Sequence, residues 1–488
     1  MRILRRLQAT LILFALSCAL FAQNASELPE SPTPSVLPVL PLLPVPIADA
    51  IQRSGLPPES VGLYVQELAT GKVVAAFHED APFNPASTMK LVTSNAALEL
   101  LGPTFTWKTQ AFADGAQQGD VLRGDLVIRG SGDPKLVLES LWLFLRKLRA
   151  RGIRDIQGNL LLDRSAFEEV PEDASAFDGD PLKPYNVGPD ALLLNYKALA
   201  LRLVPDEARH RVDVSIDPPL QHYGLQPPRL VKGECGDWKA RLQPMLDGDG
   251  ARFGGGYPLS CGEKAWYIHP WQMSHARYFE LVFRRMWADM GGQLRGEVRP
   301  GAPSPQARLV TEWESAPLSE IIRDINKYSN NVMARQLLLT LAYKAYAMPA
   351  NTARGAAAVR AWLTAKGIQA PELVIENGSG LSRVERIAPA TLGRILAASF
   401  QAPTMPEFMS SMPLVGYDGT MRSRLKDQSV AGRAHVKTGM LNDVRAVAGY
   451  VLAASGKRYV VTCLVNHPEA GRAVEMQDLL LQWVYLNG

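Results

Sequence analysis

The chain has 488 residues, a formal net charge of +4 and a charged fraction of 20%, and 47% of its residues are hydrophobic. This length allows two or three domains with sizeable cores, and the composition excludes a disordered or fibrous chain. Because the weak positive charge is not gathered into a basic run, we expect no nucleic-acid partner.

The first 22 residues have the pattern of an export signal. Arginines precede a short apolar stretch, Leu11 to Leu16, and Ala22 is a suitable cleavage residue. We therefore expect a periplasmic protein. Cys18 follows "ALS", which departs from lipoprotein signals, so lipid attachment there is the less favoured alternative. No later apolar stretch reaches the roughly 18 residues of a membrane span.

Residues 23–46 are proline-rich, with seven prolines between Pro29 and Pro46. Proline disfavours helix interiors and central strands, so this segment is expected to be a stiff, extended tether. The folded part is expected to begin near Ile47. Residues 61–77 predict a β-hairpin with its turn at Gly71.

A helix is expected to follow the hairpin, beginning near Ser87. The middle of the chain, from about 105 to 315, is richer in short strands, proline and glycine, and residues 191–205 and 210–219 predict strands there. Residues 433–466 predict three consecutive antiparallel strands, and residues 469–487 a C-terminal amphipathic helix. Both chain ends thus supply one layered α+β unit, into which the middle is inserted.

Three cysteines remain after the predicted signal. Cys235 and Cys261 lie in polar, glycine-rich sequence, and in an oxidising compartment they are expected to form a disulfide. Such a bond contributes about 3–4 kcal/mol in the chain-entropy model. The alternative is two free surface thiols. Cys463 lies in an apolar strand pattern and is expected to be a small buried residue rather than a nucleophile.

Three short motifs occur in order along the chain: Ser87-x-x-Lys90, Ser329-Asn330-Asn331 and Lys437-Thr438-Gly439. Together they match a pattern of penicillin-binding proteins and class A β-lactamases. Each motif alone is weak, because Ser87 and Ser329 could simply cap helices. Their order, with loop-to-helix, inter-helix and strand contexts, predicts one shared active site.

The spacing of the first motif has a chemical reason. Residues i and i+3 lie on one helix face, so Ser87 Oγ and Lys90 Nζ can meet across a turn. A serine hydroxyl is a weak nucleophile until a base takes its proton. Lys90 can be that base if burial and a nearby positive charge, such as Lys437, lower its pKa.

The other motif residues suit the same reaction. The backbone N–H groups of Ser87 and Met440 are expected to hold an oxyanion, and Gly439 to let the substrate backbone approach the strand. Four further side chains can act on the substrate: Lys437 and Thr438 by binding a carboxylate, Asn331 by orienting a peptide bond, and Ser329 by relaying a proton. Neither an HExxH nor a G-x-S-x-G motif is present, and we expect no metal and no cofactor.

The sequence resembles the low-molecular-mass class C penicillin-binding proteins, which are D-alanyl-D-alanine carboxypeptidases and endopeptidases. The resemblance rests on "NPASTMKLVTSNAALELLGP", "YSNNVMARQLL" and "VKTGMLNDVRAVAGYV", with "ENGSGLSRVERIAP", "MPLVGYDGTMRSRL" and "VGPDALLLNYKAL" in support. Ser329 follows Ser87 by 242 residues, far more than in class A β-lactamases.

The resemblance implies an α+β transpeptidase-like fold, an antiparallel sheet flanked by helices, with two inserted domains. It places the catalytic domain at 47–106 and 317–488, domain II at 107–183 and 276–316, and a nested domain III at 184–275. It also implies that Ser87 is acylated, that Lys90 is its base and that an acidic residue of the insertion binds the stem-peptide side chain. Asp180 is the candidate, with Asp178 close behind.

The expected function is that of a periplasmic serine DD-peptidase. It acts on peptidoglycan stem peptides or cross-links through an acyl-enzyme, and β-lactams acylate the same serine. The alternatives are a β-lactamase and a non-catalytic wall-binding scaffold. Carboxypeptidase and endopeptidase action are not separated by sequence, and a homodimer is left open.

Overall fold

The computed structural model describes residues 43–171 and 173–488. The predicted export signal, Cys18 and most of the proline-rich tether lie outside the described residues. The described part of the tether differs from the expectation at its end, because helix α2 (Val45–Ser54) begins two residues before Ile47. Pro46 fits there because the first turn of a helix needs no N–H donor from it.

A five-stranded antiparallel sheet joins the two ends of the described chain, in the order β18-β19-β20-β1-β2. Its strands are β1 (Val61–Glu67), β2 (Val73–Phe77), β18 (Ala434–Leu441), β19 (Val444–Leu452) and β20 (Arg458–Asn466). The predicted hairpin and the three predicted C-terminal strands are therefore confirmed. β18 is an edge strand, so one side of its backbone is not paired within the sheet.

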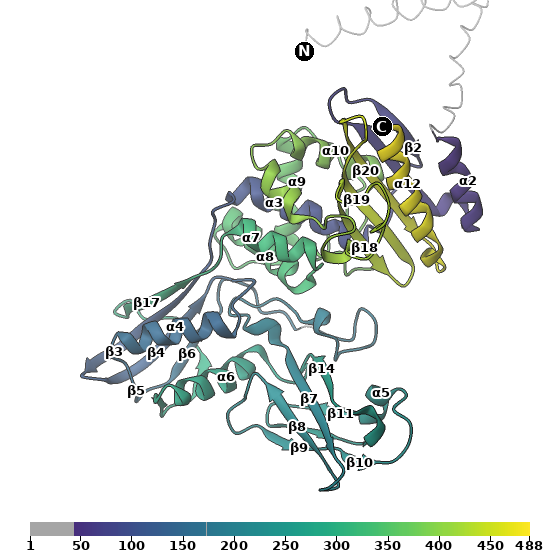
Figure 1. Cartoon of the computed structure of the whole chain (residues 1–488). Coiled ribbons are helices and arrows are strands. Elements are labelled where there is room, and N and C mark those ends of the chain that lie inside the picture. Colours follow the sequence, from purple (N-terminus) through teal and green to yellow (C-terminus); the bar gives the residue numbers. More distant parts are fainter. Residues whose placement is uncertain (1–42, 172) are drawn as a thin grey trace, which may run out of the picture. The chain divides into compact units, whose positions relative to one another are not determined.

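Helices cover both faces of this sheet (Figure 1). Alternate residues of β19 point to opposite faces: Ala448 and Tyr450 pack with the larger helical layer, and Val447 and Val451 with the smaller one. The smaller layer is α2 and α12 (Ala473–Asn487), the latter beginning four residues after the predicted start, behind a short 3₁₀ turn. The larger layer comprises α3 (Met89–Leu101), α7 (Leu318–Lys327), α8 (Asn331–Tyr346), α9 (Thr352–Ala365), α10 (Pro389–Phe400) and α11 (Met405–Ser411).

The inserted region is built on a second sheet of seven strands. Its long hairpin, β3 (Lys108–Gln118) and β4 (Val121–Gly130), is flanked by β17 (Arg308–Glu314), β5 (Asp155–Ile156), β6 (Leu160–Asp163), β15 (Gln293–Leu294) and β16 (Val298–Pro300). Helices α4 (Leu138–Ala150) and α6 (His275–Asp289) contribute to its core.

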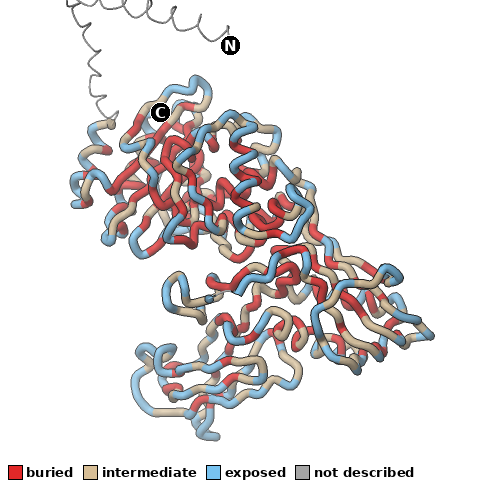
Figure 2. Tube along the Cα trace, turned by 180° about the vertical axis from the view of Figure 1, so that it is seen from behind, coloured by how far each residue is buried: buried red, intermediate tan, exposed pale blue. Residues whose placement is uncertain are grey.

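Three small sheets and a short helix occupy residues 199–268. They are formed by β7 (Leu199–Asp206), β8 (Arg211–Asp217), β9 (Gly224–Gln226), β10 (Arg229–Val231), α5 (Trp238–Leu242), β11 (Pro244–Leu246), β12 (Gly250–Phe253), β13 (Gly256–Pro258) and β14 (Lys264–Ile268). Much of this part is exposed, in contrast to the interior of the five-stranded sheet (Figure 2).

Two expectations for the insertion differ in detail from the structure. The strand predicted over 191–205 begins only at Leu199, because residues 195–197 form a 3₁₀ turn with positive φ angles. The two predicted inserted domains share one hydrophobic cluster, in which Leu126 and Phe283 of the predicted domain II join Leu201 of the predicted domain III. The domain boundaries therefore stay a prediction.

The cysteines are placed as expected. A disulfide joins Cys235 and Cys261, whose Cα atoms are 4.7 Å apart. Cys463 is a free, fully buried thiol on β20, and burial raises its pKa to about 12. A protonated thiol in an apolar core is a poor nucleophile, so Cys463 is a packing residue. Among the described helices, none is both long and apolar enough to cross a bilayer.

Candidate active site

Ser87 lies on a tight turn at the start of a buried helix. It is the middle residue of a 3₁₀ turn, Ala86–Thr88, that leads directly into α3. Asn84 shapes this turn, because its side-chain oxygen accepts a hydrogen bond from the N–H of Ala86 at 2.9 Å. Ala86 has a φ of 44°, a left-handed conformation that costs a non-glycine residue energy and is typical of functional turns.

Lys90 is fully buried one turn further along, and its ammonium group is surrounded by oxygen atoms. Its Nζ lies 3.1 Å from Ser87 Oγ, 2.6 Å from Asn331 Oδ1 and 2.5 Å from the carbonyl oxygen of Ser379. Burial, and then the charge of Lys437, hold the pKa of Lys90 well below its usual value. Both causes were expected from the sequence, and both favour the neutral amine that a base requires.

The second motif fills the break between α7 and α8. Ser329 has a φ of 58°, a second strained position at the site. Asn330 caps α8, accepting a hydrogen bond from the N–H of Met333 at 3.0 Å. The middle residue of the motif is thus a helix cap, which explains why the chain can carry Asn there. Asn331 directs its side-chain oxygen to Lys90, which leaves its amide nitrogen available for a substrate carbonyl.

The third motif lies on the edge strand β18. Lys437 is fully buried, and its Nζ is 2.8 Å from Ser329 Oγ and 2.7 Å from the carbonyl oxygen of Thr438. Burial lowers its pKa to about 7. The hydroxyl of Thr438 is 2.7 Å from that of Thr420. The structure therefore brings the three motifs together. Lys90 links the first motif to the second, and Ser329 links the second motif to the third.

Gly439 and Met440 follow on the same strand. A Cβ on Gly439 would lie 2.7 Å from the carbonyl oxygen of Pro85, so the glycine is needed to let β18 pack on the serine turn. This reason differs from the predicted close approach of substrate. The N–H of Val436 bonds outward to Pro413, and backbone groups alternate along a strand, so the N–H of Met440 also points to the outer edge.

Asp180 is not tied to the motifs by its own contacts. It is half-buried, and its carboxylate lies 3.5 Å from Lys183 Nζ. Asp178 accepts hydrogen bonds from Tyr185 at 2.6 Å and Asn186 at 2.9 Å. The preceding residue, Phe177, packs against the small cluster that contains Ala86 and Leu441, so this segment does reach the serine turn.

Three groups at the site were not singled out from the sequence: the carbonyl of Ser379, the carboxyl of Glu385 and the hydroxyl of Thr420. Ser379 and Glu385 belong to "ENGSGLSRVERIAP", and Thr420 to "MPLVGYDGTMRSRL". Both segments were noted only for their family resemblance. A carbonyl carries no side-chain signal, and a lone Glu or Thr in a glycine-rich run carries little.

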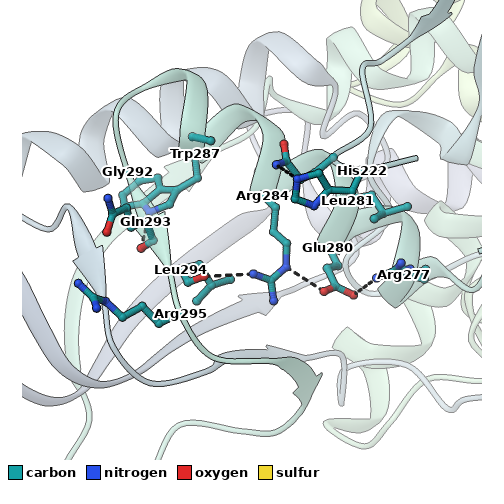
Figure 3. A pocket seen from close by; sticks show the side chains of 12 residues that line it. His222, Arg277, Glu280, Leu281, Arg284, Trp287, Gly292, Gln293, Leu294 and Arg295 are labelled. Atoms are coloured by element: carbon teal, nitrogen blue, oxygen red, sulfur yellow. Dashed lines mark hydrogen bonds and ion pairs between the residues drawn. The ribbon is translucent and has the colours of Figure 1, made fainter. Parts of the chain in front are cut away.

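The described residues include no cluster of three or more His, Cys, Asp or Glu side chains suited to a metal ion. A cavity of about 520 Å³ borders α6, away from the motifs (Figure 3). Its charged side chains are already paired. Arg284 and Arg277 both bind Glu280 at 2.9 Å, and Arg284 also bonds the carbonyl oxygen of Leu294. Arg295, which also borders the cavity, pairs with Asp155 at 2.7 Å.

Comparisons with known proteins agree with this geometry. The sequence model of the D-Ala-D-Ala carboxypeptidase 3 (S13) family matches residues 44–484. The D-alanyl-D-alanine carboxypeptidase DacB of Haemophilus influenzae is 26% identical over 437 residues, which are 87% of this chain and 89% of that protein.

Solved structures extend the likeness to the fold. Penicillin binding protein 4 of Haemophilus influenzae has a TM-score of 0.79 at 23% identity, and its complex with a β-lactam has 0.73 at 22%. Both matches cover 91% of this chain and 100% of the other. The expected α+β fold, with an antiparallel sheet flanked by helices, is confirmed.

Proposed function

Because the chain belongs to the D-Ala-D-Ala carboxypeptidase 3 (S13) family of serine hydrolases, we propose that it cleaves D-alanyl-D-alanine peptides of peptidoglycan through an acyl-enzyme on Ser87. The observation that carries this proposal is the contact between Ser87 Oγ and the buried Lys90 Nζ. A buried amine with a lowered pKa beside a hydroxyl is what an activated serine needs.

In the first half of the reaction, neutral Lys90 takes the hydroxyl proton of Ser87 as Oγ attacks the penultimate carbonyl carbon. The backbone N–H groups of Ser87 and Met440 receive the oxyanion. The bond to the terminal D-alanine nitrogen then breaks, and the proton taken from Ser87 ends on that nitrogen. Ser329 Oγ, which is 2.8 Å from Lys437 Nζ, is the proposed relay.

In the second half, a water molecule gives up one proton as its oxygen adds to the ester carbon. The bond to Ser87 Oγ then breaks, and Oγ takes up a proton to restore the hydroxyl, so that the water supplies the proton that left with the D-alanine. The product is a peptide that ends in a carboxylate. No metal or organic cofactor takes part in either half of this proposed cycle.

Substrate orientation is assigned to the strand side of the site. Charged Lys437 and the hydroxyl of Thr438 bind the terminal carboxylate, and the Asn331 amide nitrogen binds a peptide carbonyl. This arrangement supports carboxypeptidase action, since it uses a free carboxylate; DD-endopeptidase action on cross-links is the second expected activity. Asp180 remains the proposed contact for the stem-peptide amino group, because Phe177, three residues earlier in the same segment, packs near the serine turn.

β-Lactams are proposed as covalent inhibitors, in line with the β-lactam complex of the Haemophilus influenzae protein. The test is incubation with a fluorescent penicillin, followed by intact-mass measurement. Wild type gains one adduct and Ser87→Ala gains none. A Ser87→Ala protein that is still labelled would refute the assignment of the nucleophile.

Two further measurements separate the alternatives. Release of D-alanine from a defined pentapeptide, with an adduct that lasts for hours, identifies a peptidase; an adduct that is lost within milliseconds identifies a β-lactamase. A folded protein that neither binds penicillin nor releases D-alanine is a scaffold. Mass spectrometry of digested cross-linked muropeptides reports endopeptidase action.

We propose a periplasmic location on the basis of the signal-like first 22 residues. Cell fractionation with detection of the mature N-terminus tests it. A mature chain that begins after residue 22 agrees with the proposal, and a lipid-modified Cys18 supports the alternative.

A further inference from the structure

One fully buried carboxyl group near the serine turn has no place in the reaction described above. Glu385 is not exposed at all, and it closes a loop that runs from residue 376 to residue 385, called here the 376–385 loop. Its Oε1 accepts three backbone hydrogen bonds, from Glu376 at 3.1 Å, Asn377 at 3.0 Å and Gly378 at 2.8 Å. Its Oε2 is buried and has no hydrogen-bond partner among the described residues.

The 376–385 loop is fastened to the serine turn at two points. The side chain of Asn84 donates a hydrogen bond to the carbonyl oxygen of Ser382 at 2.8 Å. Gly380 has a φ of 79°, and a Cβ there would lie 1.8 Å from the carbonyl oxygen of Ala86. The loop backbone and the serine turn are therefore in direct contact.

The same loop also positions the base. The carbonyl oxygen of Ser379 accepts a hydrogen bond from Lys90 Nζ, and Ser379 follows directly after the three residues whose N–H groups Glu385 binds. Thr93, one turn along α3 from Lys90, donates its hydroxyl to the carbonyl oxygen of Gly378 at 2.7 Å. Removal of Glu385 would free the backbone segment that carries the Ser379 carbonyl.

Three charged groups act on Lys90 from the elements around it: Lys437 from β18, Arg335 from α8 and Glu385 from the loop. The first two are positive and disfavour the ammonium form, and Glu385 is the negative group that favours it. In return, Lys90 favours the ionised form of Glu385, although burial raises the pKa of that carboxyl. Glu385 forms no ion pair with Lys90 in direct contact, so its charge acts through space.

We propose that Glu385 is a positioning residue of the active site, which holds the Ser379 carbonyl against Lys90 and supplies the counter-charge to that lysine. The proposal rests on the acylation of Ser87 proposed above. It assigns Glu385 no contact with substrate and no proton transfer. Its consequence is that the pH at which Lys90 becomes a base depends on the charge at position 385.

The test is the pH dependence of the rate constant for acylation by a fluorescent penicillin, measured for wild type and Glu385→Gln. The glutamine keeps an oxygen for the three N–H groups but removes the charge. Acylation needs neutral Lys90, so the rate rises with pH through the lysine pKa. Loss of the negative charge lowers that pKa. The acidic limb of the pH–rate profile, which is the part where the rate still rises with pH, is therefore expected to move to lower pH by on the order of half a unit to one unit.

Thr93→Val is the matched control, because it loosens the same loop without changing a charge. Its rate is expected to fall while its acidic limb stays in place. Glu385→Asp keeps the charge, and its limb is expected to stay within about 0.3 unit of wild type. If Glu385→Gln fails to fold, as judged by thermal melting, Glu385→Ala replaces it, because it removes the same charge, and its acidic limb is expected to move to lower pH as well.

An unmoved limb in folded Glu385→Gln overturns the proposal, as does an equal movement in Thr93→Val or a movement of the Glu385→Asp limb. Failure of the proposed function gives a different result: the wild-type protein then shows no adduct on Ser87 at any pH.

Discussion

In the inserted region, three of the buried aspartates each face an arginine, whereas the two fully buried lysines beside the five-stranded sheet face no carboxylate within ion-pair distance in the described chain. The aspartate pairs are Asp155–Arg295 at 2.7 Å, Asp163–Arg129 at 2.6 Å and Asp190–Arg164. The unpaired lysines are Lys90 and Lys437.

This difference separates two uses of buried charge. A paired carboxylate keeps its charge because arginine replaces the lost hydration, and such a pair ties one strand or loop to another. A lysine buried without a counter-ion in contact has its pKa lowered, which is unfavourable for stability but useful for proton transfer. Burial alone therefore does not identify the site, and neither does the lack of an ion pair, because Asp133 of the inserted region is also buried and forms no ion pair within the described chain. The distinguishing feature of the site is its two fully buried lysines, Lys90 and Lys437.

The largest effect is expected for Lys90→Met, which removes the base but preserves the size and burial of the side chain. The acylation rate constant is expected to fall by roughly 10²–10⁴-fold, the usual contribution of a positioned base. Stopped-flow measurement with a chromogenic β-lactam gives this constant. Lys135→Met is the control, because Lys135 is partly exposed and pairs with Asp324 away from the serine. A Lys90→Met rate within tenfold of wild type would assign the base elsewhere.

The next effect concerns stability rather than rate. Arg164→Gln leaves the carboxylate of Asp190, which is 4% exposed, without its charged partner. Breaking a buried pair in this way costs about 3–5 kcal/mol in the free energy of unfolding, measured by denaturant titration. Acylation per folded molecule should not change. Arg202→Gln, at an exposed pair with Glu263, should not measurably alter stability. Equal losses in the two variants would contradict the comparison.

The smallest effect is expected in the alkaline limb of the pH profile. Lysine is charged below its pKa, so Lys437, with a pKa of about 7, loses its charge as the pH rises above that value. Binding of a terminal carboxylate then weakens, and kcat/KM for a D-alanyl-D-alanine peptide falls by up to about tenfold per unit. Lys437→Arg keeps its charge and should lack this limb, at a lower overall rate.

A peptide with a C-terminal amide is the control for that limb, since it carries no carboxylate for Lys437 to bind. Its kcat/KM should show no fall above pH 7. A limb that persists in Lys437→Arg, or with the amide, would assign it to another group.

Several features were predictable from local pattern alone. The short apolar runs within 433–466 predict three consecutive antiparallel strands, and the structure has β18, β19 and β20 there. The i, i+3 spacing of Ser87 and Lys90 predicts their contact across one helical turn. The predicted start of the strand that begins at Leu199 was wrong, because an apolar run does not reveal the 3₁₀ turn over 195–197.

Sequence by itself determined the chemical groups, their order and the elements that carry them, since these depend on residue type and local periodicity. Only the tertiary structure decided how the groups meet. Lys90 contacts Asn331, 241 residues away, and the carbonyl of Ser379, 289 residues away. It also decided that Glu385 is buried beside them. Such contacts arise from packing between distant segments, and no local pattern encodes the distance between them or the burial that lowers the pKa of Lys90.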